Sequence, residues 1–171
     1  MIAWIRSIAG VIAGFVVASA LMMGVEYTNA HVFYTEFAKR AEAKDKEATQ
    51  KALDSGAAPD SREVLVARRE VVRELLAGAP MGVLLVVAFG WVLGSLTGGF
   101  VAAWIGRRSP IVHGLVLGGL LTLAGIANNL MLPPPLWFWI ATIVVFFPAT
   151  YVGAQLAPRP AEAPVVAEPS S

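Results

Sequence analysis

The chain contains no cysteine and only two histidines. Without cysteine there is no disulfide, thiolate nucleophile or cysteine-ligated metal. The sequence also lacks a phosphate-binding GxxxxGK[ST] loop and an HExxH metal motif, so two common signatures of enzymes are missing. The net charge of +1 gives no electrostatic reason to expect a nucleic-acid partner. We therefore expect no cofactor and no enzyme active site.

Charge is scarce as well, at 15% of the residues, whereas 57% are hydrophobic. A soluble domain has roughly 25% charged and about 45–50% apolar residues. The charges are also segregated, because residues 26–80 hold nine of the 13 Lys and Arg and ten of the 12 Asp and Glu. A hydrocarbon solvent imposes such segregation, since a charge inside it is costly. The composition therefore predicts an integral membrane protein.

Four apolar stretches are long enough to cross a bilayer. A spanning helix needs about 20 apolar residues, because the hydrocarbon core is about 30 Å thick and each residue rises about 1.5 Å. Prolines mark the boundaries: Pro80 and Pro110 occupy favoured first-turn positions, and the three prolines from Pro133 onward cannot continue a helix. We predict an all-α polytopic fold, with spans at residues 1–25, 81–106, 110–132 and 136–157, the last three forming one region (81–157).

The first span has a second interpretation. Arg6, an apolar run and then Ala18-Ser19-Ala20 resemble a signal peptide with an A-x-A cleavage site, which would remove residues 1–20. The apolar run, however, continues through Val25 and is long enough to span. We expect the segment to be retained, with its small residues facing another helix.

Residues 26–80 form the one sizeable aqueous region, predicted to be a charged extramembrane helical hairpin. Its first helix is favoured by acid-before-base pairs at i,i+4, namely Glu36/Arg40, Glu42/Lys46 and Glu47/Lys51. Asp60, with Glu63 three residues later, predicts the N-cap of a second helix that lies on headgroups or packs on the first. The tail, residues 158–171, is rich in Pro, Ala and Glu and is predicted to be disordered.

Small residues recur at every fourth position of the second span. They are Gly90, Gly94, Gly98, Ala102 and Gly106. Lipid tails supply no hydrophobic force between helices, so helices associate where small residues let their backbones approach. We predict that this set, the small-residue ridge, is a helix-packing surface. It would lie either inside the bundle or at the seam of a homodimer or of a complex with another membrane protein.

Arginines beside the spans indicate the orientation. Arg6 precedes the first span, and Arg107 and Arg108 occupy the short turn between the second and third. Because basic residues next to spans are retained in the cytoplasm, both termini are predicted to be cytoplasmic. The nine basic residues of 26–80 favour the opposite orientation, but most lie a helix turn or more from either span in the sequence.

Three stretches of the transmembrane region are distinctive: residues 98–105 (GGFVAAWI), 124–131 (AGIANNLM) and 134–139 (PPLWFW). They resemble a group of small bacterial four-span membrane proteins of uncharacterised function. The resemblance covers roughly residues 82–157, with a weaker similarity at 26–31, and the charged insert is longer than the short loop expected for the group. It implies a four-helix fold in a bacterial inner membrane and no particular activity.

Polar residues near the span ends are the candidates for a ligand site. Glu26, Asn29 and His31 follow the first span, and Asn128 and Asn129 close the third. All five belong to the same membrane face, and an asparagine in hydrocarbon needs a hydrogen-bond partner. They are predicted to converge on a small polar site for a headgroup or solute. The alternative is that each caps its own helix end or reaches the headgroups.

Two function classes follow. The first is a non-enzymatic membrane protein that acts through helix packing and through protein or lipid contacts. The second is a small transporter or channel that uses the polar groups of the spans, namely Ser95, Thr97, Thr122, Asn128 and Asn129. No carboxylate lies in the middle of a span, and His31 and His113 fall at opposite membrane ends, which disfavours proton-coupled transport and a shared histidine metal site. The first class is therefore expected. Transport would be favoured if the polar side chains lined a water-filled cavity.

Overall fold

The computed structural model describes residues 2–107 and 109–158, and the regular structure within them is entirely helical. Four segments are long and apolar enough to cross a membrane: α1 with η1, α4, α5 and α6. The predicted all-α polytopic fold is confirmed. The predicted disordered tail lies, apart from Pro158, outside the described residues. The elements are α1 (Ile2–Thr28), the π-helix η1 (Asn29–Phe33), α2 (Thr35–Asp54), α3 (Arg62–Ala77), α4 (Met81–Gly106), α5 (Pro110–Met131) and α6 (Leu136–Leu156).

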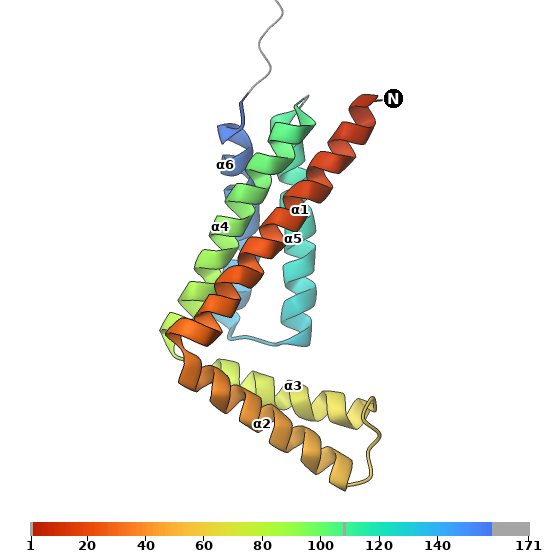
Figure 1. The fold of residues 1–171 in the computed structure, drawn as a ribbon, viewed down its shortest axis with the longest axis vertical. Helices are drawn as coiled ribbons and strands as arrows, with labels where there is room; N and C mark the ends of the chain where they lie inside the picture. The colour runs from red at the N-terminus through yellow and green to blue at the C-terminus, as the bar shows by residue number, and fades with distance from the viewer. Residues whose placement is uncertain (1, 108, 159–171) are drawn as a thin grey trace, which may run out of the picture.

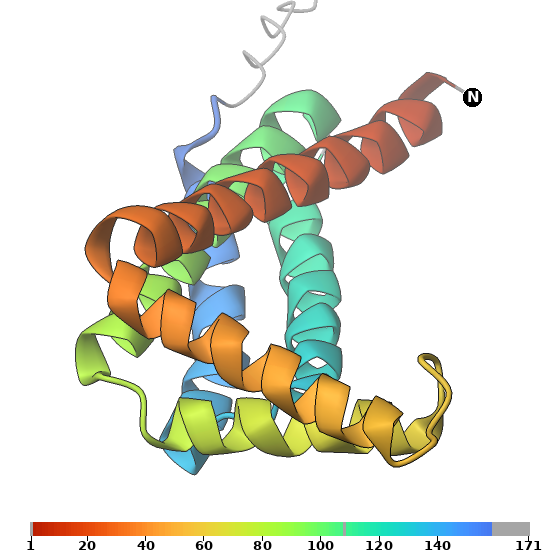
Figure 2. The same cartoon turned by 60° about the horizontal axis from the view of Figure 1, so that its bottom comes forward.

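The four spanning helices form a bundle with two different ends (Figure 1). The start of α1, the α4–α5 turn and the end of α6 lie at one end, and the α5–α6 turn lies at the other. The α2–α3 hairpin runs across this second end at a large angle to the spans, and its turn extends past α5 (Figures 1 and 2). We call this second end the hairpin end.

The small-residue ridge of α4 lies against α1. Gly98 and Gly14 are so close that a Cβ atom on either would lie 2.6 Å from the carbonyl oxygen of the other. One turn along, a Cβ on Gly94 would lie 2.8 Å from the Ala18 carbonyl oxygen. All five ridge residues are buried. Backbones this close gain dispersion energy and Cα–H···O contacts that lipid cannot replace. The ridge is thus covered within the chain, and a homodimer would have to use another surface.

α6 packs against α4 and α5 by the same means. A Cβ on Gly153 would collide with the α4 backbone, and one on Gly99 would collide with the backbone of Thr150. On α5, a Cβ on Gly114 would lie 2.9 Å from the Thr150 carbonyl oxygen. The buried Thr150 hydroxyl donates to the Phe146 carbonyl oxygen at 2.8 Å, so it is satisfied within its own helix. Glycine thus lets three helices approach to backbone distance.

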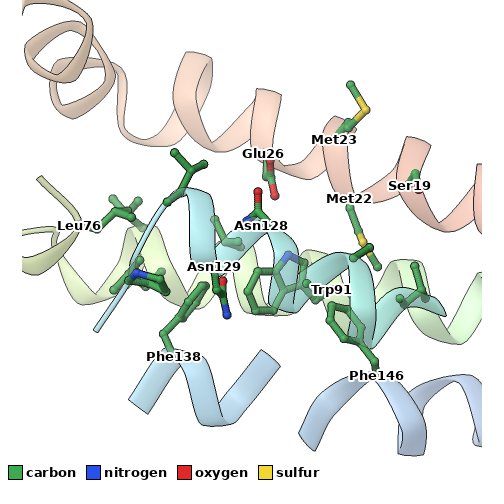
Figure 3. A pocket seen from close by; sticks show the side chains of 18 of the residues that line it. Ser19, Met22, Met23, Glu26, Leu76, Trp91, Asn128, Asn129, Phe138 and Phe146 are labelled. Carbon is green, nitrogen blue, oxygen red and sulfur yellow. The ribbon is translucent and has the colours of Figure 1, made fainter. Parts of the chain in front are cut away.

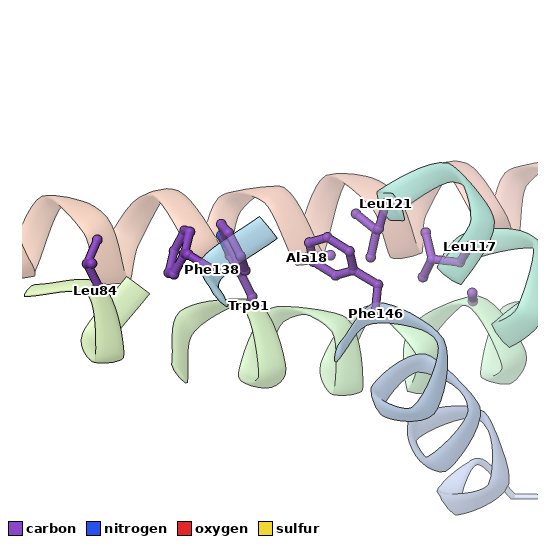
Figure 4. Close-up of a cluster of buried hydrophobic side chains, with 8 residues drawn as sticks. Ala18, Leu84, Trp91, Leu117, Leu121, Phe138 and Phe146 are labelled. Atoms are coloured by element: carbon purple, nitrogen blue, oxygen red, sulfur yellow. The ribbon is translucent and has the colours of Figure 1, made fainter. Parts of the chain in front are cut away.

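A core of aromatic and aliphatic side chains fills the bundle (Figure 4). Trp91 of α4 packs on Phe138 and Phe146 of α6, with ring centroids 4.6 and 5.6 Å apart. Ala18 and Leu117 are fully buried between α1, α4 and α5. α1 crosses α5 in the view of Figure 1 and contacts it far less than it contacts α4. The oblique crossing leaves a space between α1 and α5 toward each end of the bundle.

α1 continues past the predicted end at Val25, to Thr28, and then passes through the π turn of η1. Asn29 explains the extension: its side chain is buried, and its Nδ2 donates to the Val83 carbonyl oxygen of α4 at 3.0 Å. A π turn is wider than an α turn, and helices often kink at such turns. The chain leaves the bundle here, and α2 runs off at an angle (Figure 1).

α2 is a solvated helix without a buried residue. The predicted pair Glu42–Lys46 forms, with 2.5 Å between Nζ and Oε1, and the hydrogen bond and charge of Lys46 lower the pKa of Glu42. Glu36 pairs with Lys39, with 3.1 Å between Oε1 and Nζ, and not with the predicted partner Arg40 one residue later. α2 contacts the rest of the protein chiefly through α3 and η1.

α3 begins one residue later than predicted. Its N-cap is Ser61, whose hydroxyl accepts a hydrogen bond from the Val64 backbone N–H at 3.4 Å. The predicted cap at Asp60 is wrong. Serine and aspartate are equally good caps, and the residue with extended backbone geometry immediately before the helix, here Ser61 with φ −70° and ψ 158°, takes the role.

Exposed ion pairs join the two hairpin helices. Arg68 donates two hydrogen bonds to Asp45, at 2.9 and 3.0 Å, and Lys44 approaches Glu74 at 3.4 Å. The hydrogen bonds and charge of Asp45 raise the pKa of Arg68. Exposed pairs of this kind contribute little to stability, because water and salt screen their charges. They set how α3 faces α2 and do not attach the hairpin to the bundle.

The close approach of α1 and α4 predicts that Gly98→Ala destabilises the protein. The new Cβ would lie 2.6 Å from the backbone of Gly14, which cannot move without shifting α1. We expect a cost of about 1–3 kcal/mol, the usual range for overpacking, measured as a lower melting temperature in detergent. Gly24→Ala is the matched control, because a Cβ there meets no atom within 4 Å. Equal effects of the two substitutions would contradict the contact.

Candidate functional site

The space between α1 and α5 at the hairpin end holds a cavity of about 370 Å³, here called the wedge cavity. Its walls come from α1, α4, α5 and α6, and Leu76 of α3 and Pro134 of the α5–α6 turn line it as well. Most of the lining is apolar and includes Phe15, Met22, Leu84, Trp91, Phe138 and Phe146. Its volume falls within the range of about 300–1,000 Å³ that is typical of small-molecule sites.

Three of the five predicted site residues line the wedge cavity: Glu26, Asn128 and Asn129. Figure 3 shows Glu26 pointing from α1 toward Asn128 on α5. Both of these side chains are exposed. Glu26 is the one ionisable side chain in the described lining. One end of the cavity therefore combines a carboxylate with two amides, while the rest of the described lining is apolar except for Ser19.

Asn129 is positioned by α6. It is 1% exposed, and its Nδ2 donates to the Thr142 Oγ1 at 2.9 Å. Thr142 in turn donates to the Phe138 carbonyl oxygen at 2.8 Å. This chain of hydrogen bonds joins α5 to α6 and supplies the partner that a buried amide requires. Asn129 is thus a structural residue at the cavity wall, and its neighbour Asn128 is the amide free to meet a ligand.

The other two predicted site residues lie elsewhere. Asn29 does not line the cavity and instead donates to the Val83 carbonyl oxygen, as described above. His31 is exposed, its Nδ1 donates to the Tyr27 carbonyl oxygen at 2.9 Å, and its ring stacks on Tyr27 with centroids 4.0 Å apart. The convergence of all five residues on one site is therefore not what the structure shows. His31 bonds within its own helix end, as in the alternative interpretation. Asn29 bonds to α4, which neither interpretation predicted.

The polar groups lie at one end of an elongated cavity. Along α1 the lining runs from Glu26 back to Phe15, and along α5 from Asn129 back to Leu121. At about 1.5 Å per residue these stretches measure roughly 16 and 12 Å. Half of a hydrocarbon core about 30 Å thick has a similar length. The wedge cavity therefore extends from the hairpin face into about one leaflet.

A second cavity, of about 570 Å³, occupies the space between α1 and α5 at the opposite end. His113 lines it, is largely buried, and donates from Nδ1 to the Ser109 carbonyl oxygen at 2.7 Å. Its other ring edge lies against Gly106, where a Cβ would collide with it. The ridge glycine here makes room for an aromatic ring. This cavity holds no carboxylate among its described lining residues.

The other three polar residues named for a transport pathway, Ser95, Thr97 and Thr122, lie away from the wedge cavity. Thr97 and Thr122 donate to the carbonyl oxygens of Leu93 and Gly118 in their own helices, at 2.9 and 2.8 Å. Ser95 is fully buried, and its hydroxyl has no partner within the described part of the chain. None of these three lines either cavity between α1 and α5.

Neither the site chemistry nor similarity to other proteins identifies an activity. Within residues 2–107 and 109–158, no group of three or more His, Asp or Glu side chains is placed to hold a metal ion. No family model, curated protein or solved structure matches this chain. The resemblance of residues 82–157 to small bacterial four-span proteins stays a prediction.

Sequence reasoning did not find the apolar part of the site. Trp91 comes from α4, and Phe138 and Phe146 come from α6. Each reads as an ordinary residue of an apolar span. A hydropathy pattern does not separate lipid-facing from cavity-facing residues, because both are apolar in a membrane protein. The one available signal was the group of polar residues at the span ends.

The bond between Asn129 and Thr142 predicts energetic coupling. In a double-mutant cycle of Asn129→Ala and Thr142→Val, we expect a coupling free energy of about 0.6 kcal/mol and at most about 1.7 kcal/mol, the range measured for hydrogen bonds between membrane helices. The readout is unfolding free energy in lipid or detergent. The control cycle pairs Asn129→Ala with Thr122→Val, whose hydroxyl bonds its own helix. Coupling within error of zero in the first cycle would exclude the α5–α6 bond.

Proposed function

We propose that this integral membrane protein is not an enzyme and holds a membrane lipid in the wedge cavity, with the headgroup at Glu26 and Asn128. The observation that carries the proposal is the cavity's asymmetry: a carboxylate and an amide at the hairpin end, and a largely apolar extension of about one leaflet. A phospholipid has the same asymmetry. In this proposal, the lipid contacts that the sequence leads us to expect lie in the wedge cavity.

The acyl part of the ligand would lie between α1 and α5. Met22 of α1, the Trp91 ring of α4 and the Phe146 ring of α6 face this space (Figure 3). Methionine and aromatic side chains adapt well to a flexible hydrocarbon chain, because thioethers and rings are polarisable and make contacts in several orientations. Since α1 contacts α5 so little, a chain could enter from the bilayer between them.

The polar end favours a headgroup that donates hydrogen bonds. A carboxylate at Glu26 accepts hydrogen bonds when it is ionised, and the Asn128 amide both donates and accepts. An ammonium or hydroxyl group would therefore be bound, whereas an unpaired phosphate beside Glu26 would be repelled. Phosphatidylethanolamine has an ammonium group and a phosphate next to it, which suits Glu26 and the amide of Asn128 respectively.

Transport is the weaker candidate. The two cavities between α1 and α5 are separated by a layer that includes the buried Gly14 of α1 and the fully buried Leu117 of α5. A pathway through the bundle would have to separate this layer, where α1 contacts the ridge at backbone distance. Thr97 and Thr122 satisfy their hydroxyls within their own helices. These features support a static contact role, although Asn128 and Asn129 do line a cavity.

The proposed location is the inner membrane of a bacterium, with both termini in the cytoplasm and the hairpin on the other side. The location rests on the resemblance of residues 82–157, and the orientation rests on Arg6 and the Arg107-Arg108 pair beside the spans. Further contacts, with a second copy or another membrane protein, would use lipid-facing surfaces outside the ridge, which α1 covers.

Filling the cavity tests the lipid site. Ala124 lines the wedge cavity, so Ala124→Trp should remove most of the space for an acyl chain. We expect at least a tenfold loss of phosphatidylethanolamine retained after purification, a change of about 1.4 kcal/mol in binding, counted by native mass spectrometry. Ala127→Trp is the matched control, because Ala127 is exposed on the same helix and does not line the cavity.

Glu26→Gln tests the headgroup part separately. Loss of the charge should lower the retained ratio of phosphatidylethanolamine to phosphatidylglycerol without emptying the cavity.

In the cavity-filling experiment, equal lipid retention by the Ala124→Trp and Ala127→Trp variants would refute the site. A small water-soluble compound retained in place of lipid would favour the transport alternative.

The absence of cysteine makes the orientation easy to test. Ser55 lies in the turn of the hairpin and Ser109 in the α4–α5 turn, both exposed and at opposite ends of the bundle. In intact cells, Ser55→Cys should react with a membrane-impermeant maleimide and Ser109→Cys should react only after lysis. The reverse pattern would overturn the orientation and place the hairpin in the cytoplasm. Reaction of both in intact cells would contradict the arrangement of the spans.

A further inference from the structure

α3 has three distinct faces. Arg68 pairs with Asp45 of α2, and the buried Val64 lies one turn before it, so this side faces α2. Leu76 lies on a second side, because it packs against the core of the transmembrane bundle and lines the wedge cavity. Since residues three, four and seven apart share a helix face, the side chains on the Leu76 side can be read from the sequence.

The face that carries Leu76 is basic and apolar. Spacings of four, three and four residues place Leu65, Arg69, Val72 and Leu76 in one row. Arg62 lies three residues before Leu65, and Arg73 lies three before Leu76, so both flank the row. We call Arg62, Leu65, Arg69, Val72 and Arg73 the arginine face. Despite its apolar character, Leu65 is 61% exposed.

The acidic residues of α3 lie on the remaining side. Glu63, Glu70 and Glu74 are spaced so that they fall opposite the row through Leu76. Glu74 is approached by Lys44 of α2, and Glu70 has only a marginal contact with Arg73, at 4.0 Å with both side chains exposed. The charges of this helix are thus separated by sign across its width. A solvated helix has no need of that separation.

We infer that the arginine face of α3 binds the anionic lipid headgroups of the leaflet next to the hairpin end. Because Leu76 packs on the core, this face of α3 is directed toward the hairpin end of the bundle. The hairpin turn extends past α5, so the first half of α3 projects beyond the bundle (Figures 1 and 2). What surrounds a membrane bundle at that level is lipid headgroups. Arginine matches phosphate in geometry and charge, and the exposed leucine can enter the interface. This surface is separate from the wedge cavity.

A cysteine-labelling rate measures the proposed docking. The whole protein carrying Leu65→Cys is placed in nanodiscs of phosphatidylcholine alone or with added phosphatidylglycerol, and reacted with a water-soluble maleimide. Attraction of about 1 kcal/mol for each basic residue at an anionic surface corresponds to about a fivefold change in equilibrium. We therefore expect labelling to slow at least fivefold in the anionic nanodiscs, and to recover in about 1 M salt, where the Debye length is about 3 Å. Glu63→Cys, on the opposite side of the helix, should react at the same rate in both types of nanodisc.

Charge variants in the Leu65→Cys protein identify the residues. Arg62→Gln with Arg69→Gln should abolish the effect of phosphatidylglycerol, whereas Lys46→Gln with Lys51→Gln on α2, an equal loss of charge, should preserve it. Unchanged thermal melting would show that the hairpin still folds. Equal labelling of Leu65→Cys in both nanodiscs would overturn the inference. So would slow labelling that is independent of phosphatidylglycerol, because it would indicate burial against protein.

Discussion

The contact of α1 with the ridge of α4 determines the rest of the architecture. A membrane supplies no hydrophobic force between helices, so the bundle depends on places where backbones reach one another. Gly14 and Gly98 provide such a place, at a distance that admits no Cβ on either side. With α1 held along α4, it crosses α5 obliquely, and side chains of ordinary size cannot fill both sides of the crossing. The two cavities between α1 and α5 are the geometric consequence.

The close approach of some helices and the separation of others also determine which polar residues are bonded within the protein and which stay exposed. A buried amide must find a hydrogen-bond partner, and the helices that approach closely offer one: Asn29 donates to Val83 of α4, and Asn129 donates to Thr142 of α6. Each of these residues therefore connects two helices through a hydrogen bond. Glu26 and Asn128 lie where α1 and α5 have separated, so they remain exposed beside the wedge cavity. Divergence of two helices thus separates ligand-facing polar residues from structural ones.

In the hairpin, residues that are distant from the spans along the sequence lie close to the bundle in the folded protein. Arg62, Arg69 and Arg73 are remote from either span when counted along the chain, and this distance reduces their weight in predicting the orientation. Folding returns α3 to the end of the bundle through Leu76, and the arginine face shares its side of the helix. Pairing of Arg68 with Asp45 fixes which side that is. A basic surface beside the membrane therefore arises from residues that the sequence places far from it.

The sequence by itself determined the membrane class, the four spans and the hairpin, because these follow from hydropathy, proline positions and charge segregation, which act locally along the chain. It also located the small-residue spacing on α4, a one-dimensional pattern. The partner of that ridge, the shape of the wedge cavity and the separation of His31 from Asn128 were decided only by the tertiary structure. They depend on the crossing of helices distant in sequence, and an apolar residue reads the same whether it faces lipid, a neighbouring helix or a cavity.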